Sequence, residues 1–285
     1  MSKLTITSTT KTLLLFVFFV VISFSIRSQT VFPPECAGGN RLTREFIDEE
    51  MIYPDKAMQA GIEGTVDLSF IVHEDGSVSN IDVIQKVSPE VDAEAIRLFK
   101  HICWNPATEL GRPITVKHSY KIKFNIRRYT KITKSRGVNY FERPHEKIDT
   151  SFKVYRREET DHWPRPIFTS IDRNLPTFIV NNLEYPDAAK KQNISGVVKL
   201  QFVVETSGRV SNVVVLNAVG GGCTEEAIRV LRLIKWYPGL KNDIAVRTIM
   251  EFDLRFDLAN NSVGVPFPIP GRSIDLESIN LLLIE

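Results

Sequence analysis

The sequence predicts an α+β protein of two tandem small domains, each a three-stranded antiparallel sheet packed with helices. The first observation behind this prediction is an internal repeat in the 285 residues: superposing Tyr185 on Tyr53 leaves about 23 of about 54 positions identical. The second is the order of periodicities, because in each copy two strand patterns joined by a turn precede one helical pattern. Such an order indicates an α+β layer rather than a doubly wound sheet.

The repeated positions form the same ordered set in both copies. Each copy has a Tyr-Pro pair, a Gly before the first strand, a Gly in the hairpin turn and a Trp-x-Pro after the helix. They are Tyr53, Pro54, Gly64, Gly76, Trp104 and Pro106 in copy one, and Tyr185, Pro186, Gly196, Gly208, Trp236 and Pro238 in copy two. The period is far longer than the roughly 20 to 50 residues of solenoid repeats, so each copy should have its own core.

The elements are predicted in the same order in each copy. Short helices at residues 42–50 and 174–183 lead into the Tyr-Pro pairs. Apolar and other residues then alternate at 66–72 and 198–204, which is the period of a half-buried strand. A hairpin turn containing Gly76 or Gly208 connects these first strands to second strands at 78–84 and 210–216.

A helix follows each hairpin and runs to about residue 102 or 234, with Asp92 and Thr224 predicted as N-caps. Each helix has an apolar stripe that should cover one face of its sheet. The stripes are Ala95, Leu98, Phe99 and Ile102 in copy one, and Ala227, Ile228, Leu231 and Ile234 in copy two. Third strands at 116–126 and 246–256 complete the two sheets.

The ends of the chain differ in character from the repeats. Basic Lys3 and Lys11, an apolar run at 13–24 and the small Ser28 are typical of an export signal cleaved after residue 28. A short retained membrane anchor is the alternative, although about 20 apolar residues are needed to span a bilayer. The predicted division is therefore a signal or anchor at 1–28, domain one at 36–128, a basic linker at 129–171, domain two at 172–258 and a tail at 259–285. The apolar end of the tail should dock on the protein and cover a sheet edge of copy two.

No pattern of residues predicts catalysis, a cofactor or a metal. The five histidines, none of which recurs in the other copy, have no metal-binding or catalytic spacing. They are His73, His101, His118, His145 and His162. The three cysteines form no C-x-x-C, and Cys36 is expected to be exposed while Cys103 and Cys223 are expected to be buried. We therefore expect a non-enzymatic binding protein with no cofactor.

One cluster of charge stands out. The whole chain carries a formal net charge of only +2, which argues against nucleic acid, as does export. Seven basic residues nevertheless lie between residues 127 and 147, with Glu142 and Glu146 as the only acids. They are Arg127, Arg128, Lys131, Lys134, Arg136, Arg143 and Lys147. The two readings are a solvated linker and a contact with an anionic membrane surface.

Together, the Tyr-Pro, Gly, hairpin and Trp-x-Pro motifs resemble the TonB C-terminal domain in both copies. This resemblance implies a location in the Gram-negative periplasm, binding to short peptide segments of outer-membrane receptors by strand addition, and energy from an inner-membrane motor. Residues 13–26 contain no histidine, and the dozen residues before the first domain reach only about 40 Å. These features favour an alternative, a periplasmic adaptor with two peptide-binding domains and no contact with the motor.

The third strands are the predicted peptide-binding edges, because each is the last strand of its copy and has no later partner. The candidate residues are Val116, Lys117, Tyr120, Lys121 and Lys123 in copy one, and Val246, Arg247, Glu251 and Asp253 in copy two. Outward charges on the two strands differ in sign, so the two edges should prefer different peptides. The alternative reading is that charges on an edge strand protect it against aggregation.

Overall fold

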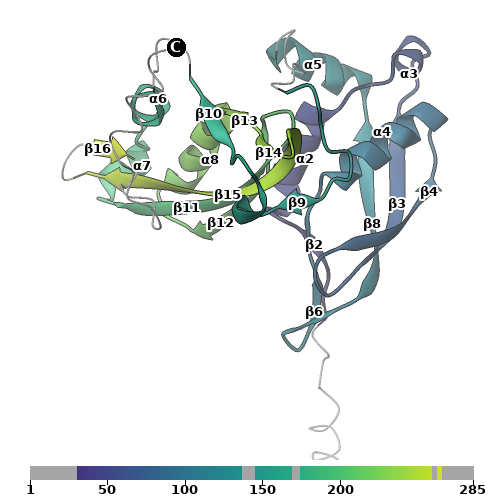
Figure 1. Ribbon diagram of the computed structural model, residues 1–285, viewed down its shortest axis with the longest axis horizontal. Helices are drawn as coiled ribbons and strands as arrows, with labels where there is room; N and C mark the ends of the chain where they lie inside the picture. The colour runs from purple at the N-terminus through teal and green to yellow at the C-terminus, as the bar shows by residue number, and fades with distance from the viewer. Residues whose placement is uncertain (1–30, 137–144, 169–173, 259–261, 265–285) are drawn as a thin grey trace, which may run out of the picture.

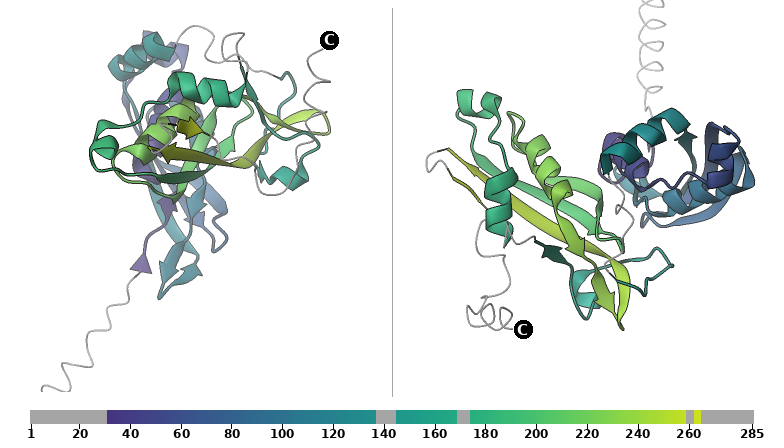
Figure 2. Two further views of the ribbon diagram at one scale, coloured as in Figure 1. Left: turned by 90° about the vertical axis from the view of Figure 1, so that its left-hand side faces the viewer. Right: turned by 90° about the horizontal axis from the view of Figure 1, so that it is seen from above.

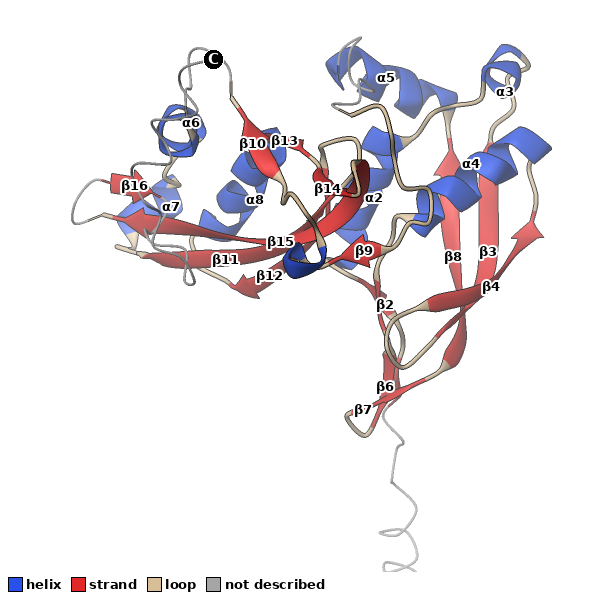
Figure 3. Ribbon diagram, viewed as in Figure 1, coloured by secondary structure: helices blue, strands red, loops and turns tan. Residues whose placement is uncertain are grey.

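The computed structural model of the protein describes residues 31–136, 145–168, 174–258 and 262–264. The two copies form two layered bodies that lie side by side (Figure 2). In each body the helices lie on one face of the sheet (Figures 1 and 3). The predicted α+β class is therefore confirmed. The predicted leader and the apolar end of the tail lie outside the described residues.

Copy one has the predicted three-stranded antiparallel sheet, in the order β4-β3-β8. The central strand β3 pairs with β8 in an unbroken register from Gly64↔Phe124 to Val72↔Val116. The elements are α2 (Gly39–Glu50), α3 (Asp55–Gln59), β3 (Gly64–Val72), β4 (Val78–Gln85), α4 (Pro89–Lys100) and β8 (Val116–Phe124). The third strand thus ends two residues earlier than predicted, because a helix begins at Ile126.

Copy two repeats this arrangement and adds strands to it. Its central part has the order β12-β11-β15, and β15 is longer than its counterpart β8. The elements are α6 (Leu175–Asn182), α7 (Asp187–Lys191), β11 (Gly196–Val204), β12 (Val210–Asn217), α8 (Cys223–Leu233) and β15 (Ile244–Asp257). Three short strands also pair with β15: β14 (Gly239–Lys241), β9 (Val154–Tyr155) and β16 (Ser262–Gly264).

Each copy also includes a short strand from the segment that precedes it. Cys36 in β2 (Glu35–Cys36) pairs with Trp104 in β5 (Trp104–Asn105), and Pro166 in β10 (Arg165–Ile167) pairs with Trp236 in β13 (Lys235–Tyr237). In copy one, β1 (Val31–Phe32) and β7 (Arg112–Ile114) flank β6 (Ala107–Glu109) in a small sheet. The repeated unit is therefore longer than the sequence motifs indicate.

The segment predicted as a linker is largely structured where it is described. It contains α5 (Ile126–Arg136), β9, a 3₁₀ turn η2 (Arg157–Glu159) and β10. Bridges from Ile148 to Ala245 and from His162 to Leu240 attach it further to copy two. We call residues 145–168 the strap. They pair with strands of copy two, so we propose that this domain begins before residue 172.

Two hydrophobic cores lie between the sheets and their helices, one in each copy. The predicted helix stripes are buried in both, and so are Trp104 and Trp236. Gly76 has a φ of +80°, and a Cβ there would lie 2.4 Å from the Trp104 carbonyl oxygen. The hairpin turn therefore requires glycine on conformational and on steric grounds. Gly208 in copy two has a φ of +78°, and its carbonyl accepts a 2.9 Å hydrogen bond from the Trp236 amide.

The predicted N-caps of the two main helices were wrong. Ser88 caps α4 by accepting a hydrogen bond from the Val91 amide. Gly222, with a φ of +88°, precedes the first residue of α8. Asp92 and Thr224 instead lie within the first turns of their helices, where they accept hydrogen bonds from the amides of Val87 and Val219.

Burial of the two tryptophans leads to a stability prediction. Trp104→Ala or Trp236→Ala should lower the free energy of unfolding of its own domain by about 3 to 5 kcal/mol, because each leaves a large cavity against the sheet. Urea unfolding followed by circular dichroism measures this loss. Trp163→Ala is the matched control, since Trp163 is half exposed and should change stability little. A loss below about 1 kcal/mol in both variants would contradict the packing of the two tryptophans against their sheets.

The strap leads to a second prediction, on domain boundaries. A fragment of residues 36–128 should unfold cooperatively by itself. A fragment of residues 145–285 should be more stable than one of residues 172–285, because only the longer one has β9 and β10. Comparison of the urea midpoints of the fragments 145–285 and 172–285 checks this prediction. Equal midpoints would show that the strap contributes nothing to copy two.

Candidate functional site

Strand β8 forms an edge of the sheet in copy one. Among the described residues it pairs with β3 alone, so the backbone groups on its outer side have no strand partner. Lys117, Lys121 and Lys123 are exposed on the sheet face opposite the helices. Val116 and Tyr120 point to the helix side and are partly buried. The predicted edge in copy one therefore has the geometry that strand addition requires.

Charged groups from neighbouring elements surround this edge. Lys121 lies 3.6 Å from the Asp67 carboxylate on β3. Arg44 on α2 lies close enough to Tyr120 to influence it electrostatically, although burial is the main reason that the pKa of Tyr120 is raised. Arg128, which follows β8, forms an ion pair with Asp48 of α2. The nearby acids Asp67 and Asp48 are thus paired internally.

The corresponding edge in copy two is not free, contrary to the prediction. On the side of β15 away from β11, Ala245 bridges to Ile148 of the strap, residues 247–248 pair in parallel with β9, and residues 255–257 pair with β16. Within the described part of the chain, the longest stretch without a strand on that side is residues 249–254. These short strands were not predicted because two or three residues show no periodicity.

Two candidate residues of this edge are buried. Val246 is 2% exposed and Arg247 is 3% exposed. Arg247 therefore does not point outward to a peptide, as the sequence analysis expected. Glu251 is exposed and Asp253 is partly exposed, and Asp253 lies 3.5 Å from Lys199 on the neighbouring strand.

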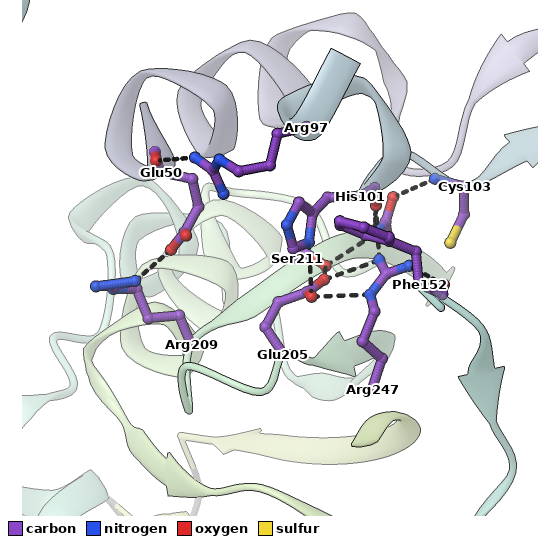
Figure 4. Close-up of polar contacts among 10 residues, drawn as sticks. Glu50, Arg97, His101, Cys103, Phe152, Glu205, Arg209, Ser211 and Arg247 are labelled. Atoms are coloured by element: carbon purple, nitrogen blue, oxygen red, sulfur yellow. Dashed lines mark hydrogen bonds and ion pairs between the residues drawn. The ribbon is translucent and has the colours of Figure 1, made fainter. Parts of the chain in front are cut away.

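Arg247 instead belongs to a buried polar network between the two copies (Figure 4). Its Nε and Nη2 donate to the Glu205 carboxylate at 2.8 and 2.9 Å. The same carboxylate accepts a hydrogen bond from Ser211 and lies 2.9 Å from Nδ1 of His101, the C-cap of α4 in copy one. Glu205 is 1% exposed. A buried carboxylate is thus satisfied by groups from both copies.

The backbone of copy one completes the network. The His101 carbonyl accepts hydrogen bonds from Arg247 Nη2 at 2.7 Å and from Asn212 Nδ2 at 2.9 Å. The Cys103 amide donates to Asn212 Oδ1 at 2.8 Å. Arg247 Nη1 donates to the carbonyl of Phe152 in the strap at 2.7 Å. Copy one, copy two and the strap therefore meet at one guanidinium group.

The charges in this network shift one another's pKa values. Burial alone would raise the pKa of Glu205, but Arg247 and His101 hold it well below its usual range. Burial would lower the pKa of Arg247, and Glu205 raises it. Glu50 at the end of α2 has a raised pKa because it is buried, although Arg209 of copy two forms an ion pair with it.

Helix α2 makes further contacts with copy two. Arg232 of α8 binds Glu45 and Glu49 on α2. At the start of α2, a Cβ on Gly38 would lie 2.1 Å from the Val213 carbonyl oxygen of β12. Only glycine permits this approach of one backbone to the other. Copy one thus covers the outer edge of β12 around Val213.

Two of the three cysteines differ from expectation. Cys36 is buried rather than exposed, because β2 pairs with β5 and places it in the core of copy one. Cys223 is buried as expected, and Cys103 is partly buried at the contact between the copies. All three are free thiols.

Sequence reasoning did not find this network. In the equivalent positions of copy one, His73 hydrogen-bonds to Ser79 at 2.7 Å, so the repeat itself marks Glu205 and Ser211 as facing each other. Nothing in the sequence, however, indicates which surface of copy two meets His101. Within the described residues, no group of three or more His, Cys, Asp and Glu side chains is arranged to hold a metal ion. No described helix has both the length and the hydropathy for crossing a membrane.

One comparison with known proteins, that with family models, matches both copies of the repeat. The family model for the Gram-negative bacterial TonB protein C-terminal matches twice, at residues 49–126 and 181–258, which together make up more than half of the chain. A search of curated proteins found no match. The solution structure of the Helicobacter pylori TonB C-terminal domain is similar at 25% identity with a TM-score of 0.23, covering 30% of this chain and 77% of that one.

The buried carboxylate leads to a prediction on stability and pH. Glu205→Gln should lower the free energy of unfolding by about 3 to 5 kcal/mol at pH 7, because the Arg247 charge then stays buried without its partner. The folded-state pKa of Glu205 is depressed, so its stabilisation is present above the unfolded pKa of about 4.3 and is lost as the pH falls further. The difference between wild type and variant should therefore shrink between about pH 5 and pH 3.

The control for this prediction is Glu251→Gln, which changes an exposed carboxylate in the same domain. Its unfolding free energy should stay within about 0.5 kcal/mol of wild type. Urea titrations at several pH values provide both measurements. A constant difference between Glu205→Gln and wild type over the whole range would contradict the ionised state of Glu205.

Proposed function

Because the chain belongs to the TonB C-terminal family, we propose that it is a TonB-like protein of the Gram-negative cell envelope. In this proposal it binds peptide segments of outer-membrane receptors by β-strand addition and takes part in energy-dependent transport across the membrane. It is exported to the periplasm, and its activity is binding rather than catalysis.

The observation that carries this proposal is the unpaired outer side of β8. An edge strand exposes a row of backbone N–H and C=O groups, and an extended peptide satisfies them by becoming the next strand. The nine residues of β8 are regularly paired with β3 on their inner side, so the edge is already in the extended conformation. A peptide therefore meets a rigid template and only the peptide loses conformational freedom on binding.

A periplasmic adaptor is the second candidate function. In that case the same edge binds an envelope protein, but the chain makes no contact with a proton-driven motor. The absence of histidine from the apolar run and the short segment before copy one favour this version. Retention or loss of residues 1–28 in the mature protein, measured by mass spectrometry, separates it from a membrane-anchored transducer.

The test of strand addition uses proline. Lys121→Pro in β8 and Glu251→Pro in the open part of β15 each remove a backbone donor from a candidate edge. Binding of a receptor's periplasmic N-terminal peptide is measured by calorimetric titration after circular dichroism has shown that each variant folds. We expect Lys121→Pro to weaken binding at least tenfold. Unchanged affinity in both folded variants would place the peptide elsewhere.

A further inference from the structure

We propose that β8 of copy one is the strand-accepting edge of the whole chain and that it selects acidic peptide segments, whereas copy two has filled its own edges with strands and loops of the chain. This inference rests on the proposed function, since it assumes that peptides bind by strand addition. It assigns different roles to two copies that the sequence presents as equivalent.

Other parts of the chain occupy much of both sheet edges in copy two. On the β15 side, β9 and β16 leave residues 249–254 between them without a strand, and a longer peptide would collide with β9 or β16 at either end of this stretch. On the β12 side, the backbone at Gly38 lies directly against Val213. Copy two therefore has no edge of full length to offer.

The two edges of copy one differ in regularity. The pairing of β4 with β3 has register shifts, and Asn80 in β4 has a φ of +51°. Such bulges twist an edge strand and hinder the addition of another strand. The pairing of β8 with β3 continues without a shift over all nine positions. Of the two free edges, β8 is the better template.

The pairing of the strap with β15 in copy two shows where the repeated fold accepts an added strand. In the alignment of the copies, Val246 corresponds to Val116, so Arg247 and Thr248 correspond to Lys117 and His118. In copy two, β9 lies in parallel on Arg247 and Thr248. In copy one, no described strand lies at the equivalent position. The same place on the repeated fold is thus filled by the chain in one copy and open in the other.

The charges next to β8 determine which peptides fit. Lys117, Lys121 and Lys123 all point to one face of the sheet, where alternate residues of an added strand would lie beside them. On the helix side, the incoming strand meets the surroundings of Tyr120, where Arg44 contributes a positive charge. An added strand with acidic residues at alternate positions complements this edge, and a strand with basic residues is repelled.

The experiment compares three nine-residue peptides that differ only in charge. Each has valine at alternate positions, and glutamate, glutamine or lysine at the others. Calorimetric titration of the full chain should give one bound peptide per chain and about tenfold tighter binding of the glutamate peptide than of the glutamine peptide. The preference should weaken as salt is raised, because the lysines are exposed to solvent.

Two sets of variants locate the site. The triple variant Lys117→Gln, Lys121→Gln and Lys123→Gln should lose the preference for glutamate over glutamine while it still binds both peptides. The matched control, Glu251→Gln with Asp253→Asn in copy two, should bind all three peptides as wild type does. Both sets change exposed or partly exposed side chains, so the fold should be retained, which circular dichroism checks.

The possible failures are distinguishable. If the three peptides bind equally well, or if only the copy two variant alters binding, the inference is wrong but strand addition itself stands. Two peptides bound per chain would show that copy two also has an open edge and would overturn the division of roles. If no peptide binds, both the inference and the proposed function fail.

Discussion

The buried pair of Arg247 and Glu205, together with His101, fixes how the two copies meet. Removing two charges from water is costly, and the cost is offset only when every donor and acceptor is satisfied. Here the donors of Arg247 reach Glu205 in copy two, the His101 carbonyl in copy one and the Phe152 carbonyl in the strap. Moving either copy away would leave a buried charge with too few partners. The relative placement of the copies therefore depends on this network, and the ion pairs of α2 with Arg209 and Arg232 add to it.

This placement separates the roles of two similar domains. Once His101 and α2 are docked on copy two, Gly38 lies against β12, and Phe152 holds the strap next to the start of β9. Copy two thereby keeps no free edge of full length. Strand β8 of copy one takes no part in these contacts and keeps its outer backbone groups available. A tandem duplication has in this way produced one supporting domain and one domain with an open edge.

The sequence predicted the elements that have a local signal. The three long strands of each copy, the glycine turns and the apolar helix stripes follow from periodicity and are present. The short strands of the strap, β1 and β2 were not predicted, because strands of two or three residues are defined only by a distant partner such as Trp104. Arg247 shows the same limit of sequence-based prediction at the candidate functional site. Its place in the strand pattern indicated an outward charge, and only the position of copy one explains why it is buried.

The lysines of β8 fit both interpretations of a charged edge strand, which are protection against aggregation and recognition of a peptide. Two copies of β8 placed edge to edge would bring lysines close to lysines, and each like-charged pair across strands is unfavourable by about 0.2 to 1 kcal/mol. The same side chains stabilise an acidic strand by a similar amount for each pair. Protection against self-association and selection of an acidic partner are therefore one property of Lys117, Lys121 and Lys123. Because Lys121 is already near Asp67 at 3.6 Å, the other two lysines provide the larger part of the discrimination.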